Sequence, residues 1–403
     1  MPGEAPFRSL PARVIVAGGG IAALELVVAL HKLAGERVAI ELIAPGEHFV
    51  YRPLLVAEPF GVGNLPRFPL SQILNDQGAS QRRGRLAEVR AQEHEVSIDS
   101  GEQIAYDALV VAAGARTVEA VAGALTFDGP ESVTLMRTLV ERAATGELGS
   151  IAFALAASAA SWSLPLYELA LMTAIRAPGA HITIATAEDA PLQLFGQAVS
   201  RSMAERLSRA GVELLTGVAP VEYEDAALAL ADGRRVNADA AVALPALAGP
   251  AIPGLPHDPR GFVPVDEHGR VEGTADVYAA GDVTAFELKQ GGVSVRQAQA
   301  VAECIAARIG APVVPQPFEP FLRGMLLTGA APSYMQWRGG ESEQADSPLW
   351  WPPTKIADSY LVPYLVSRFQ LSVLAAPGPG EADLISSAPA GGEVPARPRR
   401  PGA

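Results

Sequence analysis

Apolar residues occur in short runs along the first part of the chain, separated by a glycine turn and by a stretch rich in Ala and Leu. Residues 14–17 predict a buried strand, residues 18–20 a tight turn, and residues 21–33 a helix. A second apolar run over residues 38–43 predicts another buried strand. This order of elements is typical of a βαβ unit with two parallel strands.

The same plan is repeated in the middle of the chain. Residues 151–155, 164–175 and 181–185 predict a second strand–helix–strand unit. Residues 86–115 and 212–247 each alternate apolar and polar positions around a glycine turn and then end in an apolar strand, as a β-meander does. We therefore predict an α/β fold with two Rossmann-like dinucleotide-binding domains, each a three-layer ββα arrangement with a β-meander insertion.

The pattern also predicts where the domains begin and end. After Ala311 the chain contains more proline and aromatic residues, which predicts a small C-terminal region, and the last residues are rich in Pro, Ala, Gly and Arg, which predicts a disordered tail. The predicted parts are residues 1–114 and 251–311 for a first domain in two pieces, 115–250 for a second domain, 312–387 for the C-terminal region and 388–403 for the tail.

An apolar stripe with helical spacing lies in the C-terminal region. It consists of Ile356, Leu361, Leu365 and Phe369, and the aromatic residues Trp350, Trp351, Tyr360 and Tyr364 gather near it. The pattern favours core packing, and it is also compatible with a dimer contact or a contact with a membrane.

Composition narrows the range of partners. The 403 residues are 49% hydrophobic and 19% charged, which is a globular balance. The net charge of −13 argues against nucleic acid as a partner, because binding to phosphates needs clustered Lys and Arg. No apolar run reaches the roughly 18 residues needed to span a bilayer, and residues 1–13 have no apolar core of an export signal. We expect a cytoplasmic protein, with peripheral contact at the inner face of the membrane and a homodimer left open.

The first glycine turn has the residues of a dinucleotide fingerprint. Residues 18–23 read Gly-Gly-Gly-Ile-Ala-Ala, a GxGxxA variant between a strand and a helix. Gly18 permits the tight turn, Gly20 lets the backbone approach a pyrophosphate, and the small Ala23 lets helix and strand pack closely. The alternative is a glycine turn in another kind of α/β protein. The expected cofactor contacts are Gly18, Gly19, Gly20, Ile21, Ala22 and Ala23.

Two later segments point to a family. Residues 106–115 read Tyr-Asp-Ala-Leu-Val-Val-Ala-Ala-Gly-Ala, and residues 277–282 read Val-Tyr-Ala-Ala-Gly-Asp after Thr274. With the first turn they resemble the FAD-binding sequences of the pyridine nucleotide-disulfide oxidoreductase superfamily, and within it of the sulfide:quinone and type II NADH:quinone branch, over about residues 13–310. The resemblance implies FAD as the cofactor. It also implies cofactor contacts from Arg52, Ala113, Gly114, Gly281, Asp282, Lys289 and Gln290.

The resemblance assigns roles to some of these side chains. The Asp282 carboxylate can accept hydrogen bonds from ribityl hydroxyls. Lys289, or the N-terminus of the helix predicted over residues 295–308, would stabilise the negative charge of reduced flavin. The alternative for Lys289 is an ordinary solvated lysine.

Two regions, one in each predicted domain, depart from the pattern of nucleotide-binding domains. Ala44 stands where an acidic residue usually binds the adenosine ribose, and Glu41 should point to the other face of its strand and have its own partner. In the second domain, Ser161, Ser163 and Leu166 stand where the family has three glycines, which argues against conventional NAD(P)H binding.

Glu168 lies two residues after the last of those positions and matches the glutamate of the family's GxGxxGxELA sequence. In the quinone-reducing branch a glutamate at this place lies near the flavin, which makes Glu168 a candidate proton relay. A helix-surface carboxylate is the alternative. Cys304, the one cysteine, is predicted to be a buried small hydrophobe, and the paired-thiol mechanisms of the sulfide and disulfide branches are excluded. The histidines form no cluster, and no metal site is expected.

These observations predict an FAD-dependent oxidoreductase that passes electrons from a reduced small-molecule donor to a quinone-like or other small acceptor, with Lys289 and Glu168 as catalytic candidates. One alternative is an NAD(P)H-dependent flavin dehydrogenase in which the hydroxyls of Ser161 and Ser163 bind phosphates. The other is a flavin-binding or cofactor-free scaffold or sensor.

Overall fold

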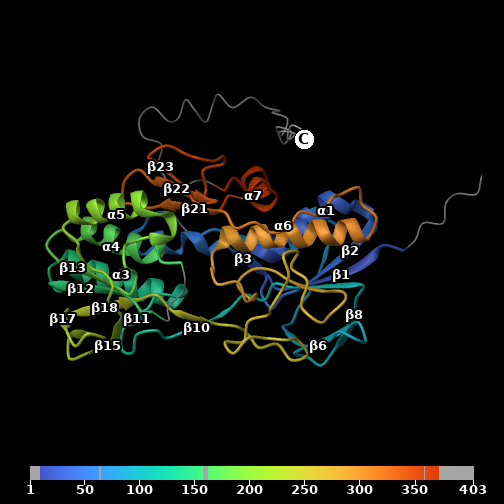
Figure 1. Ribbon diagram of the computed structural model, residues 1–403, viewed down its shortest axis with the longest axis horizontal. Helices are drawn as coiled ribbons and strands as arrows, with labels where there is room; N and C mark the ends of the chain where they lie inside the picture. The colour runs from blue at the N-terminus through green and yellow to red at the C-terminus, as the bar shows by residue number, and fades with distance from the viewer. Residues whose placement is uncertain (1–9, 63–64, 158–161, 358, 372–403) are drawn as a thin grey trace, which may run out of the picture.

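Two parallel β-sheets form the body of the protein and occupy its two halves in Figure 1. This computed structural model describes residues 10–62, 65–157, 162–357 and 359–371. The predicted α/β class is confirmed, because both sheets are parallel and are connected through helices.

The first sheet has five strands in the order β20-β9-β1-β2-β5. Their bounds are β20 (Val277–Ala279), β9 (Ala108–Val111), β1 (Ala12–Ala17), β2 (Val38–Ile43) and β5 (Ser80–Arg82). Val14 and Val16 of β1 pack in the core that contains α1 (Ile21–Ala34) and α6 (Gly291–Arg308), whereas Ile15 packs in the core under a β-meander. Alternate residues of β1 therefore pack against layers on opposite faces of the sheet, as the three-layer prediction requires.

The second sheet repeats this arrangement with the order β11-β18-β12-β13-β14. Its strands are β11 (Leu125–Thr126), β18 (Ala240–Ala243), β12 (Ser150–Leu155), β13 (His181–Thr186) and β14 (Glu213–Leu215). The connecting helices are α3 (Pro130–Ala144), α4 (Leu164–Arg176) and α5 (Gln197–Arg209). Since α4 joins β12 to the adjacent parallel strand β13, its first turn lies at the carboxyl edge of the sheet.

A three-stranded antiparallel meander accompanies each sheet. The first consists of β6 (Leu86–Arg90), β7 (Glu95–Ile98) and β8 (Gln103–Ala105), and the second of β15 (Pro220–Glu224), β16 (Ala227–Leu230) and β17 (Arg235–Asn237). The antiparallel pair β10 (Arg116–Val118) and β19 (Ala246–Ala248) carries the chain out of the first sheet and back from the second. In Figure 1, β10 lies between the two halves.

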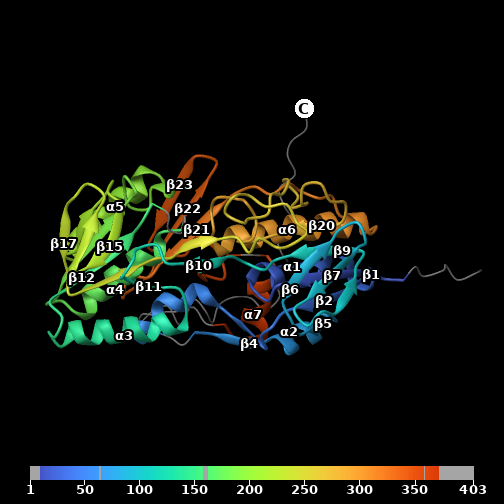
Figure 2. The same cartoon turned by 90° about the horizontal axis from the view of Figure 1, so that it is seen from below.

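Helices α1 and α6 pack against each other over the first sheet and are seen together in Figure 2. Small and β-branched residues such as Ala23, Val27, Ala298 and Val301 are fully buried there. The remaining elements are β3 (His48–Val50), β4 (Arg67–Pro69), α2 (Leu70–Asp76) and the 3₁₀ helices Gly35–Arg37, Arg52–Phe60 and Gln193–Phe195. Among the described residues, none of the helices combines the length and the hydropathy that crossing a bilayer would require.

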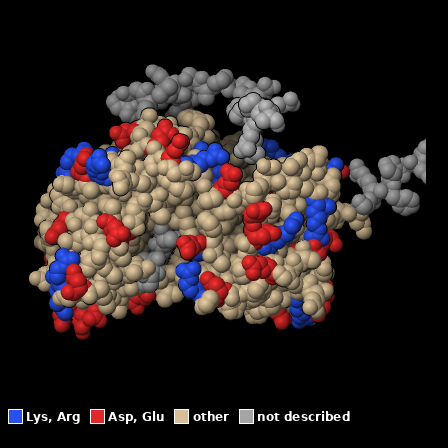
Figure 3. Space-filling view, viewed as in Figure 1, with Lys and Arg blue, Asp and Glu red and all other residues tan. Residues whose placement is uncertain are grey.

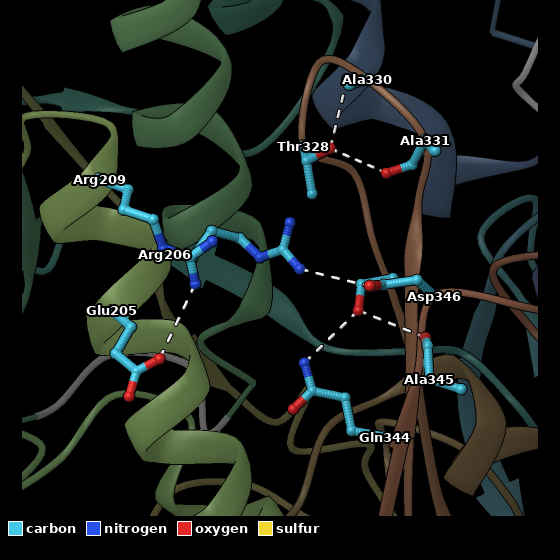
Figure 4. Close-up of polar contacts among 10 residues, drawn as sticks. Glu205, Arg206, Arg209, Thr328, Ala330, Ala331, Gln344, Ala345 and Asp346 are labelled. Carbon is cyan, nitrogen blue, oxygen red and sulfur yellow. Dashed lines mark hydrogen bonds and ion pairs between the residues drawn. The ribbon is translucent and has the colours of Figure 1, made fainter.

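The C-terminal region contacts both halves. Its antiparallel sheet consists of β21 (Leu322–Leu326), β22 (Ser333–Arg338) and β23 (Glu341–Ala345), and α7 (Leu361–Phe369) follows. Figure 4 shows Arg206 of α5 reaching toward Asp346 just after β23, with 3.5 Å between Nη2 and Oδ1. On the other side, buried Glu25 of α1 accepts hydrogen bonds from Leu361 N at 2.7 Å and from Gln299 Nε2 at 2.6 Å. The C-terminal region therefore connects the two halves through its contacts with α5 and α1.

Three details differ from the sequence prediction. Helix α6 begins at Gly291, four residues before the predicted start, because Gln290 caps it: its Oε1 accepts from Val293 N at 2.9 Å. The antiparallel sheet β21–β23 was not predicted. The predicted helical stripe was wrong for Ile356, which lies in the irregular segment before α7, although Ile356, Leu361 and Leu365 are all buried. The predicted disordered tail lies outside the described residues.

Candidate functional site

The glycine turn after β1 is shaped by two different requirements. Gly18 has φ +137°, and a Cβ on it would overlap the carbonyl oxygen of Ala112, so no other residue fits. Gly20 is the N-cap of α1, and a Cβ there would have no heavy atom within 4 Å. Gly18 therefore serves the packing of β1 against the end of β9. Gly20 leaves the helix N-terminus open to an anionic group.

The second glycine segment meets the first at the start of α1. Ile21, Ala22 and Ala23 are the first residues of this helix. Gly281 has φ +85°, and a Cβ on it would lie 3.0 Å from Ala22 Cβ. Its N–H donates to Gln297 Oε1 of α6 at 2.8 Å. Glycine and alanine at these two positions allow the close approach of segments that are far apart in the sequence.

Ala113 and Gly114 complete this edge of the sheet. They follow β9, which is paired with β1 on one side and with β20 on the other. Gly114 has φ +74°, and Ala113 is exposed. The carboxyl ends of three adjacent parallel strands thus bring three predicted segments together, although they are separate in the sequence.

Asp282 and Lys289 are charged groups held close to this edge. Burial raises the pKa of Asp282, and the charge of Lys289, the hydrogen bond from Ser294 and the charge of Arg52 oppose that rise. Ser294 Oγ donates to Asp282 Oδ1 at 3.2 Å. Arg52 itself is exposed at the start of its 3₁₀ helix.

Lys289 is not the solvated lysine of the alternative interpretation, because it is only 8% exposed. Its Nζ donates to the Thr284 carbonyl and lies 3.9 Å from the centroid of the Phe262 ring. Burial lowers the pKa of Lys289 to about 8, and Asp282 opposes this effect. Gln290 donates from Nε2 to the Arg323 carbonyl at 3.1 Å while its Oε1 caps α6.

Glu168 of α4 forms a buried ion pair that the sequence did not predict. Its Oε1 accepts from Lys355 Nζ and, at 2.7 Å, from Leu327 N, and both charged residues are almost completely buried. Oε2 is buried and has no hydrogen-bond partner among the described residues. Burial raises the pKa of Glu168 and lowers the pKa of Lys355, and each partner's charge opposes the shift of the other. Glu168 is therefore not a helix-surface carboxylate.

Lys355 and Ile356 connect this pair to the start of α6. Ile356 N donates to Tyr51 Oη at 3.1 Å, and its side chain occupies the space that a Cβ on Gly291 would need. Lys355 was missed because it lies in an irregular segment, 187 residues from Glu168, where no periodicity or motif marks it. Charge in a mostly apolar stretch was the one available signal.

The position where the family binds the adenosine ribose is occupied by Ala44, and the nearby Glu41 is already paired. Ala44 is buried, and Glu41 forms ion pairs with Arg13 at 2.9 Å and with Arg82 at 2.6 Å. The prediction that Glu41 has its own partner is confirmed. The edge formed by Gly18, Gly20 and Gly281 fits a dinucleotide, since it offers an open helix N-terminus, but the contact to the adenosine ribose would have to come from elsewhere.

Two of the three residues that stand in place of the family's glycines in the second domain are among the described residues. Ser163 donates from Oγ to Glu188 Oε1 at 3.0 Å, and Leu166 is completely buried in the core. Ser161 lies outside the described residues. Both positions therefore have side chains that occupy space which a glycine would leave free.

The one cysteine and the charged surface were also considered in the sequence. Cys304 is buried in α6, as predicted, and accepts from Arg270 Nη2 at 3.3 Å. On the face shown in Figure 3, basic and acidic side chains are interspersed over the described part of the surface.

Comparison with known proteins places the chain in a family. Residues 12–302 match the family described as pyridine nucleotide-disulphide oxidoreductase. The chain is 29% identical to the ferredoxin reductase component of a chlorobenzene dioxygenase from Cupriavidus sp. strain PS12, over 75% of this chain and 76% of that protein. It is 28% identical to the ferredoxin–NAD(+) reductase component of the p-cumate 2,3-dioxygenase system from Pseudomonas putida, over 57% of this chain and 56% of that protein, so it spans about half the length of this relative.

The fold is shared with a solved structure. The sulfide:quinone oxidoreductase from Aquifex aeolicus superposes with a TM-score of 0.74 at 18% identity, over 83% of this chain and 87% of that chain. The predicted superfamily is confirmed. The chain belongs to the pyridine nucleotide-disulphide oxidoreductase family, whose members are FAD-dependent oxidoreductases.

Proposed function

We propose that this protein passes electrons from a reduced donor, by way of FAD, to a quinone-like or other small acceptor, and that it does so without a cysteine pair. The observation that carries the proposal is the convergence of Gly18, Gly114 and Gly281 at one sheet edge, between the N-terminus of α1 and the buried Lys289. A fold alone would not require an open helix N-terminus and a buried cation at the same edge.

The chain's own groups would hold FAD in three places. The turn from Gly18 to Ala23 would bind the pyrophosphate at the positive end of α1. Asp282 would accept hydrogen bonds from the ribityl chain. Lys289 and the first turn of α6 would lie at the ring, where positive charge favours a reduced, anionic ring. When bound, FAD supplies a ring that takes electrons from one substrate and gives them to another.

Glu168 is the candidate proton relay in this proposal. Burial raises the pKa of Glu168, so its protonated form is easier to populate than that of an exposed glutamate, while the charge of Lys355 favours the carboxylate. Lys355 Nζ would hold Oε1 by its hydrogen bond, and Oε2, which has no partner among the described residues, would be the oxygen that gives or takes a proton. Lys355 would act with Glu168 as a positioning residue.

The acceptor has a second candidate. Two relatives are ferredoxin reductase components, which favours a ferredoxin as the alternative to a quinone. A thiol relay is not part of either version, because the chain has one cysteine and it is buried in α6. A scaffold or sensor role would be supported by a folded protein that binds no flavin.

Visible absorption of the purified protein tests the proposal. We expect oxidised-flavin bands that bleach under anaerobic conditions with a suitable reductant, and that return on addition of a water-soluble quinone. NADH, NADPH and sulfide are added in turn as donors, and a ferredoxin is tried in place of the quinone. Protein that is folded but has no flavin, even after incubation with FAD, would contradict the proposal. Reoxidation by ferredoxin alone would favour the second acceptor.

A further inference from the structure

Glu188 lies at the place where a dinucleotide would bind in the second domain. Strands β12 and β13 are adjacent and parallel, so their carboxyl ends share one edge of the sheet. Ser163 is the N-cap of α4, which follows β12, and Glu188 lies two residues beyond the end of β13. In doubly wound domains this edge, at the start of the helix, receives the pyrophosphate.

Both carboxylate oxygens of Glu188 are hydrogen-bonded to side chains at the start of α4. Ser163 Oγ donates to Oε1 at 3.0 Å, and Tyr167 Oη donates to Oε2 at 2.5 Å. The backbone is fixed as well, since Glu188 N donates to Thr186 Oγ1 at 3.0 Å and Gly217 N donates to the Glu188 carbonyl at 2.8 Å. Burial raises the pKa of Glu188, and the hydrogen bonds from Tyr167 and Ser163 oppose that rise.

The first turn of α4 has few donors left for another anion. Pro165 has no N–H, and Leu166 N donates to the Ser163 carbonyl at 3.0 Å. A pyrophosphate at this helix would lack those two donors and would also face the carboxylate of Glu188. The hydroxyl of Ser163, which could have bound a phosphate, is already used by Glu188.

We propose that Glu188 is a specificity-determining residue: its carboxylate, held by Ser163 and Tyr167, closes the edge of the second sheet to the phosphates of NADH and NADPH. This inference rests on the proposed function and narrows its donor to one that does not bind here as a dinucleotide. One relative is named a ferredoxin–NAD(+) reductase component, which makes NADH the first nucleotide to test here.

The test measures equilibrium binding of NADH and NADPH to the full-length protein by titration calorimetry. We expect wild type to show no dissociation constant below about 1 mM. Glu188→Ala should tighten binding by about tenfold or more, because a like charge facing the phosphates is removed. Glu188→Gln keeps the volume and much of the hydrogen bonding and should also tighten binding. If Glu188→Ala does not fold, the binding measured for Glu188→Gln tests the role of Glu188.

Asp189→Ala is the matched control, because it removes the same charge from the adjacent, exposed residue. Its binding should stay within about twofold of wild type, since exposed charges are well screened. The inference is overturned by micromolar binding to wild type, by Glu188 variants that bind no better than wild type, or by equal tightening in Asp189→Ala. Flavin absorption on the same samples separates the two proposals. Loss of flavin with the expected nucleotide pattern contradicts the proposed function alone, whereas a flavoprotein that binds NADH tightly contradicts the role of Glu188 alone.

Discussion

The carboxylate of Glu168 and the ammonium of Lys355 pair inside the protein, at a sequence separation of 187 residues, and both are almost inaccessible to solvent. The pair joins α4 of the second domain to the irregular segment that closes over the start of α6. An ion pair in such a place is costly to desolvate, so each partner depends on the other.

Loss of one partner should destabilise the protein strongly. Lys355→Met leaves the Glu168 charge buried without compensation, and we expect it to lower the free energy of unfolding by roughly 3–5 kcal/mol. Adding Glu168→Gln in the same chain should restore a large part of that loss, because the uncompensated charge is gone. Urea unfolding of wild type, both single variants and the double variant measures the coupling. Additive losses in the double variant would show that the pair does not interact as described.

Glu25 should make stability depend on pH in a defined window. Burial raises its pKa to about 7 from 4.5, so the folded state favours the protonated form. The stabilisation that the protonated Glu25 carboxyl contributes is complete below pH 4.5 and is lost as the pH rises through about 7. Glu25→Gln, which keeps the acceptor for Leu361 N, should therefore gain stability relative to wild type over this range, by on the order of 3 kcal/mol in total. Thermal unfolding of both proteins from pH 4.5 to 8 checks this. A difference that does not change with pH would contradict it.

Lys289 should raise the reduction potential of bound flavin. Replacing it with Met removes a buried cation beside Asp282, and we expect the potential to fall, because the negative charge of the reduced ring loses its stabilisation. The effect of the substitution should shrink as the pH rises above about 8, where wild-type Lys289 loses its own proton. Spectroelectrochemical titration gives the potentials, with Lys32→Met at an exposed lysine as the control. Equal potentials in wild type and Lys289→Met at pH 7 would remove Lys289 from the site.

Alanine substitutions at Gly18 and Gly101 distinguish backbone strain from steric overlap of the added Cβ. Both have positive φ, but a Cβ on Gly18 would overlap the Ala112 carbonyl oxygen, whereas a Cβ on Gly101 would have no heavy atom within 4 Å. Gly101→Ala should cost about 1 kcal/mol of unfolding free energy, and Gly18→Ala at least about 3 kcal/mol. Chemical denaturation compares the two. Similar losses would mean that the turn relaxes to accept a side chain.

Periodicity and glycine placement were enough to predict the two βαβ units. Strand β2 (Val38–Ile43) and the start of α1 at Ile21 were predicted to the residue, because buried parallel strands are continuous apolar runs and the glycines mark the turn. The start of α6 was missed because Gly291 and Gly292 are poor helix formers, and the cap that fixes them is a glutamine, which is not among the favoured capping residues.

The site was predictable where a motif marks it and not where distant residues meet. Gly18, Gly281 and Asp282 stand in recognisable sequences. Lys355, the partner of Glu168, has no local signal, and its role depends on a fold that brings it across 187 residues. Glu188 lies just past a predicted strand, but only the structure shows that its carboxylate turns back onto Ser163 and Tyr167.

The flavin content of a Gly20→Leu variant tests the central claim most directly. Gly20 has an extended backbone, and its Cβ direction is open, so the variant should fold while its side chain fills the space proposed for the pyrophosphate. Gly179→Leu, at an exposed glycine with equal space, is the control. We predict wild-type flavin in Gly179→Leu and almost none in Gly20→Leu, with both proteins folded. Full flavin in folded Gly20→Leu would contradict the assignment of this turn as the FAD site.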